Sequence, residues 1–475
     1  MAVWRGPRRT CAAAAAAALV GGAALVGSTV ASSSAAAAAS AGTGSIVYQV
    51  RPIAIQASAS TSAAGLTPGA CIASVGLACY DPQILHQAYQ VPWTIDGAAA
   101  GTGEQVAIVD AYGSPTVALD LATFDAAFGL PPADLHVYHP DGQPTYNPRQ
   151  VAGETGWAEE TSLDVQTVHD LAPGARINLV VASSPDGNAI NVAEDYAVTH
   201  HLGTVLSMSF GAPEAAIAGG GNNLQLQQAD AIFHQAVTQG MSLFASSGDR
   251  GATNGLAAAN ALFPASDPEV TAAGGTDLFV RADTSHNTTS TNGSYAGETA
   301  WNDSDPATCP FGCTLGVFGA TGGAPSAVFP APAYQTAVSG QAMRTTSDVA
   351  FNASVYTSTL VYLGFLGGSS NGFYFFGGTS ESAPSWAAIT ADLAQGARHG
   401  FGLLNTTLYA LAANSTSYHA DFHDVTVGNN RDPYPSAPGF PARSGYDLPT
   451  GLGTPIVSGL LASLAPHATA GYRQP

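Results

Sequence analysis

The chain contains no lysine. Its 475 residues include 33 acidic residues and 13 basic ones, all of them arginine, so the formal net charge at pH 7 is −20. A surface of that sign repels nucleic acids and anionic membranes, and we expect neither as a partner. In acid the carboxylates are neutralised, and few basic residues then means little cationic self-repulsion. A GC-rich genome, which favours alanine, glycine, proline and arginine over lysine, explains the same composition equally well.

Beyond the N-terminus the sequence has no apolar run long enough to span a membrane. At the N-terminus, three arginines precede an uncharged run of mostly alanine, valine, leucine and glycine that begins at Cys11. This succession of basic, apolar and small residues is typical of a secretory signal, and Ala31 or Ala41 suits cleavage. A membrane anchor is the alternative, but alanine is too weakly apolar to hold the run firmly in a bilayer. We therefore predict a signal peptide over 1–41 and a secreted, extracellular protein.

Cysteine is scarce, with five residues in the whole chain. Removal of Cys11 with the signal leaves an even set in two local pairs. This set predicts the disulfides Cys71–Cys79 and Cys309–Cys313 in an oxidising compartment. Zinc binding is the alternative, but the spacings Cys-x7-Cys and Cys-x3-Cys are not the usual ones for zinc ligands, and no histidine is close by.

Strand-like and helix-like segments alternate from Gln105 onward. Apolar runs and apolar spacing predict strands at 105–110, 175–182, 205–211 and 242–247, and helices at 119–128, 157–171, 189–200, 224–239 and 381–394. This alternation predicts an α/β fold with a mainly parallel sheet covered by helices on both faces. The Gly/Ser/Thr/Asn-rich region 284–325 is predicted to form loops. Residues 42–82 are predicted to be a short leader or extended arm, followed by one domain over 83–465 and a tail over 466–475.

A serine stands just before a predicted helix in the segment Gly377-Gly-Thr-Ser-Glu-Ser-Ala-Pro384. The glycines allow a close backbone approach, and Ser380 then lies among free backbone N–H groups at the positive end of the helix dipole. Such groups stabilise an oxyanion, which suits a nucleophilic serine. Serine is also a common helix N-cap without any chemical role, so this motif alone leaves both interpretations open.

Two carboxylates lie one turn apart on the helix predicted at 157–171. Glu160 and Asp164, at positions i and i+4, share one helix face and repel each other there. Repulsion raises one pKa of such a pair, which produces a base able to work in acid. A solvated acidic helix face is the alternative interpretation.

A third acidic residue, Asp249, follows the apolar strand at 242–247 in the segment Ser246-Ser-Gly-Asp249. Site residues gather at strand ends in α/β sheets. An ionised aspartate repels an oxyanion, whereas a protonated one donates a hydrogen bond and stabilises it. A turn-forming aspartate is the alternative.

Taken together, these segments resemble the sedolisin family of serine-carboxyl peptidases, which are relatives of subtilisin. The resemblance runs from about Asp81 to about Leu464 and extends to the segments Ser207–Gly211 and Phe263–Thr276. It implies a subtilisin-like three-layer α/β/α fold with a mainly parallel central sheet and a C-terminal calcium-binding loop region. It also implies a serine-type endopeptidase that acts on peptide or protein substrates, and we expect a monomer.

The resemblance implies a role for the serine and for each of the three acidic residues singled out above. Ser380 corresponds to the nucleophile, Glu160 to the general base and Asp164 to its partner. Asp249 corresponds to the acid that stabilises the oxyanion. All four positions carry the residue type that the family has there, so an inactive relative is not expected.

The resemblance also implies substrate contacts and one structural calcium ion. The substrate-binding segment of the family corresponds to Ser207, Ser209 and Gly211. The calcium ligands correspond to Asp424, Val425, Arg443, Gly445 and Asp447, with side-chain oxygens from the two aspartates and backbone carbonyls from the others. Oxygen ligands suit Ca²⁺. Family members often have alanine or glycine where Arg443 stands, and a nearby cation weakens calcium binding. An ordinary Gly/Asp turn is the alternative.

Two residues invite other interpretations. His169 suggests a Ser-His-Asp triad, but it stands five positions beyond Asp164, off the Glu160 face, and the sequence has no His-Gly-Thr motif. We therefore predict a packing or surface histidine. Asp110, at the end of the first strand, either supports the site or forms a strand-end turn.

The segment 42–82 is a departure from the family, whose members usually carry a long propeptide that assists folding. Either this short segment substitutes for it, with Cys71–Cys79 as a clasp, or the chain has no inhibitory prodomain.

The sequence thus predicts a secreted serine-carboxyl peptidase that is most active at roughly pH 3–5 and loses activity towards neutrality as Asp249 ionises. One alternative is a non-catalytic secreted protein on the same fold that binds peptides or calcium. A second alternative is a neutral Ser-His-Asp subtilisin.

Overall fold

The computed structural model describes residues 45–217, 219–283, 289–313, 315–431 and 439–474. The signal peptide predicted for residues 1–41 lies outside the described residues. Residues 43–475 form one compact unit, and the description below concerns the described part of that unit.

An eight-stranded sheet forms the centre of the unit, with the strand order β13-β12-β10-β8-β5-β7-β6 and with β16 also paired to β12. Its strands are β5 (Gln105–Ala111), β6 (Asp134–Tyr138), β7 (Arg176–Ala182), β8 (Val205–Met208), β10 (Ser242–Ser246), β12 (Val270–Val280), β13 (Tyr295–Ala300) and β16 (Val349–Asn352). Every pairing is parallel except that of β12 with the edge strand β13. The predicted mainly parallel sheet is confirmed.

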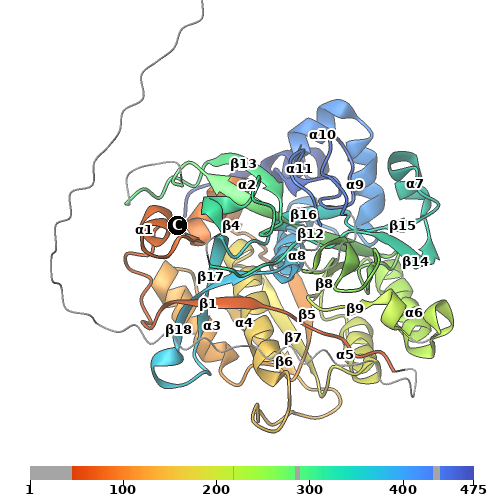
Figure 1. Cartoon of the computed structure of the whole chain (residues 1–475), viewed down its shortest axis with the longest axis horizontal. Helices are drawn as coiled ribbons and strands as arrows, with labels where there is room; N and C mark the ends of the chain where they lie inside the picture. The colour runs from red at the N-terminus through yellow and green to blue at the C-terminus, as the bar shows by residue number, and fades with distance from the viewer. Residues whose placement is uncertain (1–44, 218, 284–288, 314, 432–438, 475) are drawn as a thin grey trace, which may run out of the picture. The chain divides into compact units, whose positions relative to one another are not determined.

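Helices cover both faces of this sheet. The helices α4 (Glu154–Leu171) and α8 (Thr379–Ala397) pack on one face, and α3 (Val117–Phe128) packs on α4. The helices α5 (Gly187–Thr199) and α6 (Leu224–Thr238) contact the sheet from the other side (Figure 1). Alternate residues of β5 point to opposite sides: Val106 and Ile108 join the core under α4 and α8, whereas Ala107 and Val109 join the core under α5 and α6. The predicted three-layer α/β/α architecture is confirmed.

Two strand predictions need correction. The region 284–325, predicted as loops, contains β13, whose sequence Tyr-Ala-Gly-Glu-Thr-Ala has no apolar run because an edge strand needs none. The strand predicted at 205–211 ends at Met208. Beyond it the backbone of Ser209 turns towards Ser380, whose hydroxyl donates to the Ser209 carbonyl.

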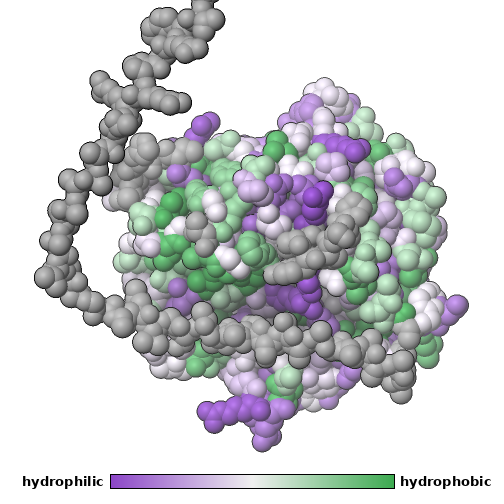
Figure 2. Space-filling model, viewed as in Figure 1, coloured by the Kyte–Doolittle hydropathy of each residue, from purple (hydrophilic) through white to green (hydrophobic). Residues whose placement is uncertain are grey.

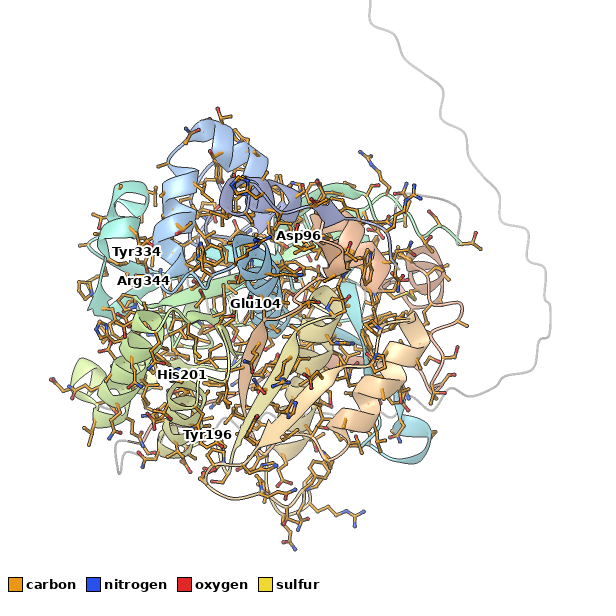
Figure 3. The ribbon with its side chains drawn as sticks, turned by 180° about the vertical axis from the view of Figure 1, so that it is seen from behind. Asp96, Glu104, Tyr196, His201, Tyr334 and Arg344 are labelled. Carbon is orange, nitrogen blue, oxygen red and sulfur yellow. A yellow bond between two sulfur atoms is a disulfide. The ribbon has the colours of Figure 1, made fainter. Side chains whose placement is uncertain are left out.

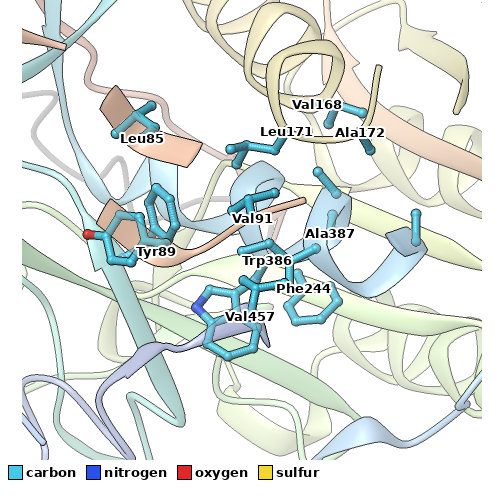
Figure 4. Packing of buried hydrophobic residues seen from close by; sticks show 14 of the residues in the cluster. Leu85, Tyr89, Val91, Val168, Leu171, Ala172, Phe244, Trp386, Ala387 and Val457 are labelled. Atoms are coloured by element: carbon cyan, nitrogen blue, oxygen red, sulfur yellow. The ribbon is translucent and has the colours of Figure 1, made fainter. Parts of the chain in front are cut away.

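The core beneath α8 fixes the position of that helix. Figure 4 shows Trp386 and Ala387 of α8 packed among Val168 and Leu171 of α4 and Phe244 of β10. The indole N–H of Trp386 donates to the Ala350 carbonyl at 2.8 Å, so this buried polar group is satisfied. Because almost every residue of α8 is buried, the start of the helix cannot shift without disturbing the core.

A second sheet, with the order β1-β18-β17-β2, consists of β1 (Ile53–Ser58), β2 (Ala78–Tyr80), β17 (Thr357–Leu363) and β18 (Gly372–Gly377). The segment predicted as a leader or arm therefore supplies two of its strands, and Figure 1 shows β1 lying beside β18. A disulfide joins Cys71 of α1 (Pro68–Val75) to Cys79 of β2, and a second joins Cys309 to Cys313. Both predicted disulfide pairings are confirmed.

The remaining elements are short. The helices are α2 (Pro82–Tyr89), α7 (Ala333–Ser339), α9 (Leu404–Ala412), α10 (Ser415–Asp421) and α11 (Val457–Leu464). The strands are β3 (Thr94–Ile95), β4 (Ala98–Ala99), β9 (Ala212–Pro213), β11 (Leu262–Phe263), β14 (Pro325–Pro330), β15 (Met343–Thr345), β19 (Phe422–His423), β20 (Thr454–Pro455) and β21 (Ala470–Gly471). Strand β21, within the predicted C-terminal tail, pairs with β3.

A buried ion pair ties β15 to the central sheet. Arg344, which lies close to Tyr334 in Figure 3, is fully buried, and its guanidinium donates to both carboxylate oxygens of Asp348, at 2.7 and 2.5 Å. Asp348 also accepts from the backbone N–H of Ala272 in β12 at 2.8 Å. Burial of an arginine is tolerated here because its charge is paired and both terminal nitrogens have acceptors.

Hydrophobic and hydrophilic residues are intermixed on the face that carries β1 (Figure 2). Large apolar side chains that are exposed come from distant parts of the chain, such as Val75, Leu119, Val192 and Leu315. Within the part of the chain that the structure describes, no helix is both long and apolar enough to cross a membrane.

Candidate active site

Ser380 stands where β18 turns into α8. The strand ends at Gly377, Gly378 adopts a φ of 142°, and α8 begins at Thr379, so Ser380 is the second residue of the helix. A Cβ on Gly378 would lie 3.1 Å from Oδ2 of Asp249, so glycine keeps this approach open. The Ser380 hydroxyl donates a long hydrogen bond, 3.4 Å, to the Ser209 carbonyl. The hydroxyl is therefore held only weakly.

Pro384 leaves one backbone carbonyl in the first turns of α8 without its usual N–H donor. In a regular helix the N–H of residue 384 donates to the carbonyl of residue 380, and proline has no N–H. The Ser209 hydroxyl lies 3.2 Å from that Ser380 carbonyl and 2.8 Å from Oδ1 of Asp164, so its one proton is shared between these two acceptors. Ser209 thus links the backbone of Ser380 to the carboxylate of Asp164 in α4.

Glu160 lies in α4 next to the Ser380 hydroxyl and is fully buried. Burial raises its pKa well above the usual range, and the adjacent Ser380 hydroxyl partly opposes that shift by stabilising the ionised form. Among the described residues, no donor meets either carboxylate oxygen in regular hydrogen-bond geometry. A strong acceptor with free lone pairs therefore stands beside a weakly held hydroxyl, which is the arrangement that a general base needs.

Three carboxyl groups share this buried space. Asp110, at the end of β5, joins Glu160 and Asp164, and none of the three is exposed to solvent. Burial raises the pKa of Asp110 to about 8 and that of Asp164 well above its usual range, and the charge of Asp110 raises the pKa of both helix residues further. The group therefore keeps protons in acid and ionises as a unit. Asp110 therefore lies together with the two helix carboxylates, which favours the interpretation that it supports the site.

Asp249 faces the same serine from the loop after β10. Its Oδ1 accepts from the backbone N–H of Thr379 at 2.7 Å and from the Thr379 hydroxyl at 2.8 Å, which leaves Oδ2 towards Gly378. Burial raises the pKa of Asp249, while the two Thr379 donors and the charge of Arg51 act in the opposite direction. With Oδ1 occupied as an acceptor, Oδ2 is the atom that can carry a proton.

The side chain of His169 contacts other residues than those described around Ser380. Its Nε2 lies 2.8 Å from the Pro131 carbonyl and 3.3 Å from a carboxylate oxygen of Asp125, and the ring is fully buried. Burial lowers its pKa. The prediction of a packing histidine is confirmed.

The three residues predicted to bind substrate differ in their hydrogen-bond partners. Ser207 lies within β8 and is buried, and the side chain of Ser209 is engaged by Asp164. Gly211 instead presents its backbone at an edge, where it pairs in antiparallel fashion with Gln49. The backbone of this segment that pairs with another strand is therefore at Gly211, which is itself buried.

The predicted calcium ligands converge on one loop. Asp424 accepts from the backbone N–H of Gly445 at 3.1 Å, and Asp447 accepts from the backbone N–H of Arg443 at 2.7 Å. Burial raises the pKa of Asp447 to about 7, and the neighbouring charge of Asp424 contributes to the increase. No cluster of three or more His, Cys, Asp or Glu side chains suited to a metal occurs in the described ranges, so a cation here depends on backbone carbonyls. An all-oxygen donor set with two repelling carboxylates fits a hard divalent cation.

The sequence did not identify Thr379 as the hydrogen-bond partner of Asp249, and it left two interpretations of Asp110 open. The only signal for Thr379 was its position directly before Ser380, since its partner Asp249 lies 130 residues away in the chain. Asp110 ends an apolar strand that runs parallel to β8, and only the sheet order brings it beside α4.

Comparison with known proteins agrees with this fold. The family model described as the subtilase family matches residues 149–432. Kumamolisin from Bacillus sp. (strain MN-32) is 32% identical over 406 residues, which cover 82% of this chain and 64% of that protein. Sedolisin from Pseudomonas sp. (strain 101) is 28% identical over 392 residues, covering 79% and 61%. This chain therefore spans less than two thirds of the length of these relatives.

A solved structure is similar over most of both chains. It is described as Pseudomonas sedolisin, a serine-carboxyl proteinase, complexed with two molecules of pseudo-iodotyrostatin. The match has a TM-score of 0.68 and 26% identity, and it covers 82% of this chain and 99% of that one. The architecture is thus of the subtilisin-like class. The chain belongs to the subtilase family and, within it, to the sedolisin family of serine-carboxyl peptidases.

Proposed function

We propose that this chain is a secreted serine-carboxyl peptidase that hydrolyses peptide bonds in acid. The observation that carries the proposal is that the buried carboxylate of Glu160, which has no hydrogen-bond partner of regular geometry among the described residues, lies beside the weakly held hydroxyl of Ser380. A structural carboxylate in a core normally has hydrogen-bond partners, because an unsatisfied one is costly. An unsatisfied acceptor beside a serine at a helix start fits a site built for proton transfer.

In the proposed mechanism Ser380 Oγ attacks the carbonyl carbon of the substrate while Glu160 takes its proton. The backbone N–H of Ser380 and the protonated Oδ2 of Asp249 donate hydrogen bonds to the oxyanion. Glu160 then passes the proton to the departing amine, which leaves an acyl-enzyme. Water hydrolyses that ester by the same route in reverse. Asp164, held by Ser209, orients Glu160 and shares its proton.

This mechanism requires opposite protonation states in two places, at the three neighbouring carboxyl groups that include Glu160 and at the separate carboxyl group of Asp249. The group of Asp110, Glu160 and Asp164 has to lose a proton before Glu160 can accept one from serine. Asp249 has to keep its proton in order to donate. Both requirements are met only within a window of pH. Loss of the first proton from the three carboxyl groups sets its lower edge and ionisation of Asp249 sets its upper edge, and burial moves both edges upward because it raises the pKa of all four groups.

The test is hydrolysis of an acid-denatured protein by the purified chain between pH 2 and pH 8. We expect a bell-shaped dependence of kcat/KM with a maximum at roughly pH 3–5 and a decline towards neutrality. Mass spectrometry of the products separates endopeptidase from tripeptidyl-peptidase action. Trapping of an acyl-enzyme by acid quench separates an enzyme from a protein that only binds peptides. A maximum above pH 7 would contradict the carboxylate base.

The proposal includes one structural calcium ion in the C-terminal loop. Asp424 and Asp447 would hold it together with the carbonyls of Val425, Arg443 and Gly445, and its charge would relieve the repulsion between the two carboxylates. A bound ion stabilises only the folded state, by about 2.7 kcal/mol at a calcium concentration 100 times the Kd. We therefore expect chelation to lower Tm by several degrees and added calcium to restore it.

The calcium prediction has a matched control. Asp447→Asn is expected to abolish the response of Tm to calcium, whereas Asp195→Asn, at an exposed position of α5, is expected to keep it. If calcium changes the Tm of neither the parent chain nor Asp195→Asn, the loop is an ordinary turn.

A further inference from the structure

A cavity of about 580 Å³ lies between α2, the start of β13, α11 and the segment that follows β21. Its volume falls within the range of about 300–1,000 Å³ that is usual for pockets that bind small molecules. None of its lining residues takes part in the proposed peptidase mechanism, and none belongs to the predicted calcium loop. The cavity is therefore a candidate binding site separate from both.

The side chains around this cavity differ from the composition of the chain as a whole. Ten described residues line it: four glutamines, two serines and one residue each of tyrosine, tryptophan, histidine and arginine. None of the ten is acidic or aliphatic, although the chain has 33 acidic residues and is 46% hydrophobic. A cationic ligand would meet no carboxylate here, and an aliphatic ligand would meet no aliphatic side chain. Arg473 is exposed, so water weakens its attraction for an anion.

His86 and Trp93 form the floor of the cavity. Their rings are parallel to within 5°, with centroids 3.6 Å apart, and both side chains are almost fully buried. Nδ1 of His86 lies 3.2 Å from the Val91 carbonyl and Nε2 lies 2.9 Å from the Asp170 carbonyl, so each ring nitrogen already has a partner. The backbone N–H of Trp93 donates to the Gly471 carbonyl at 2.7 Å. The floor is therefore a fixed aromatic surface that offers a ligand no charge.

Three glutamines form one wall of the cavity. Gln83, Gln87 and Gln90 lie at positions i, i+4 and i+7, on one face of α2 and its C-cap. The amide oxygen of Gln87 accepts from the backbone N–H of Gly293 at 2.9 Å, and that of Gln90 accepts from the Ser458 hydroxyl at 2.6 Å. Because a backbone N–H can only donate, the bond from Gly293 fixes the orientation of the Gln87 amide. Both amides are thus held through their oxygens, and their NH₂ groups are available to a ligand.

Tyr472 adds an aromatic ring at the mouth of the cavity. The residue is 48% exposed, and its hydroxyl interacts with that of Ser458, which also bonds to Gln90. The ring is apolar on its faces and polar at its hydroxyl. A ligand that complements this mouth and the glutamine wall has C–H surface to pack on an aromatic ring and hydroxyl groups at its edges to accept from amides.

We propose that this cavity binds a short uncharged saccharide. A sugar ring has C–H faces that pack on aromatic side chains, and each of its hydroxyl groups can both donate and accept a hydrogen bond. Glutamine amides and serine hydroxyls also offer donors and acceptors without a net charge, so the two sets of groups match. The ligand would contact α2 and the C-terminal segment together, and it would therefore bind only the folded chain.

The first experiment titrates the full chain at pH 6 with maltotriose, cellotriose and triacetylchitotriose by isothermal titration calorimetry. At least one of the three is expected to bind with a Kd of about 1 mM or lower. Tetraglycine and glucuronate are titrated beside them as an uncharged peptide and an anion, and neither is expected to bind.

The same titration is repeated with a pair of matched variants. Gln90→Glu keeps an oxygen for the Ser458 hydroxyl but replaces the NH₂ donor with a carboxylate oxygen, which is ionised at pH 6. We expect it to weaken saccharide binding at least about tenfold. Gln228→Glu makes the same chemical change at an exposed position of α6 that does not line the cavity, and it is expected to leave the affinity unchanged.

A third variant blocks the cavity. Ser294 lines it from an exposed position, so Ser294→Trp places a large side chain at its mouth. We expect this variant to lose saccharide binding while the Tm of the ligand-free chain and its hydrolysis of a short peptide stay as in the parent chain.

Equal affinity in the parent chain, Gln90→Glu and Ser294→Trp would place the saccharide elsewhere and overturn the inference. Failure of all three trisaccharides to bind, or binding of tetraglycine or glucuronate alone, would overturn the assigned class of ligand. None of these outcomes depends on whether the chain hydrolyses peptides, so the inference and the proposed function can fail separately.

Discussion

Replacing Ser380 with alanine is expected to reduce kcat for peptide hydrolysis by at least about 10⁴-fold at pH 4, with little change in stability. Among the described residues, the one hydrogen bond of regular geometry that this hydroxyl donates is long, 3.4 Å to the Ser209 carbonyl, so its removal costs the fold little. The alanine variant has no oxygen to form the acyl-enzyme, and the free acceptor of Glu160 has no proton to take. Initial rates on a peptide identified from the digestion products measure the loss.

Ser385→Ala is the matched control. Ser385 lies on the same helix and is also buried. Its hydroxyl donates to the backbone carbonyl of Glu381 one turn earlier, and not to a residue that takes part in the proposed mechanism. We expect its activity to stay within a few-fold of the parent chain, and circular dichroism to show that both variants are folded. Full activity in Ser380→Ala would falsify the assignment of the nucleophile.

Removal of the carboxyl group of Asp249 is expected to have the next largest effect. Asp249→Ala takes away one donor to the oxyanion, and losses of about 10²–10³-fold in kcat are typical of such a change. The variant also leaves the backbone N–H and hydroxyl of Thr379 without their present acceptor. The loss is measured at pH 4, where the parent chain has its donor in place.

Asp249→Asn distinguishes a proton donor from a charged group. The amide oxygen can replace Oδ1 as the acceptor for Thr379, which directs the amide NH₂ to the position of Oδ2. An amide donates at every pH, whereas the parent carboxyl group stops donating as the pH rises through its elevated pKa. We therefore expect Asp249→Asn to lose less activity than Asp249→Ala and to retain it at higher pH. An unchanged decline of activity towards neutrality in Asp249→Asn would show that another group sets the upper limit.

The order of strands and helices was predictable because each buried element carries its own pattern. The segment at β5 contains the apolar run 106–109, as a strand covered on both faces requires, and α6 repeats its apolar residues at helical spacing. The edge strand β13 and the arm strand β1 were not predicted. Their residues are mixed, and what makes them strands is a neighbour distant in sequence: β12 for β13, and β18 for β1.

The chemical types at the site were also predictable from the sequence. Glu160 and Asp164 had to share a helix face, and Ser380 had to stand at a helix start, since both statements depend only on local geometry. Their mutual distance did not follow from local geometry. It depends on the packing of α4 against α8 over a common core of Val168, Leu171 and Trp386.

The sequence by itself determined the alternation of strands and helices, the disulfide pairs and the acidic character of the residues around the serine. These properties depend on side-chain chemistry and on spacings of a few residues. Only the tertiary structure decided that Asp110 joins the two helix carboxylates, that Thr379 holds Asp249, and that the segment 49–58 pairs with Gly211 and with β18. The physical reason is that the burial and backbone pairing behind these contacts arise between segments far apart in the chain, and no local pattern encodes which distant edge a strand will meet.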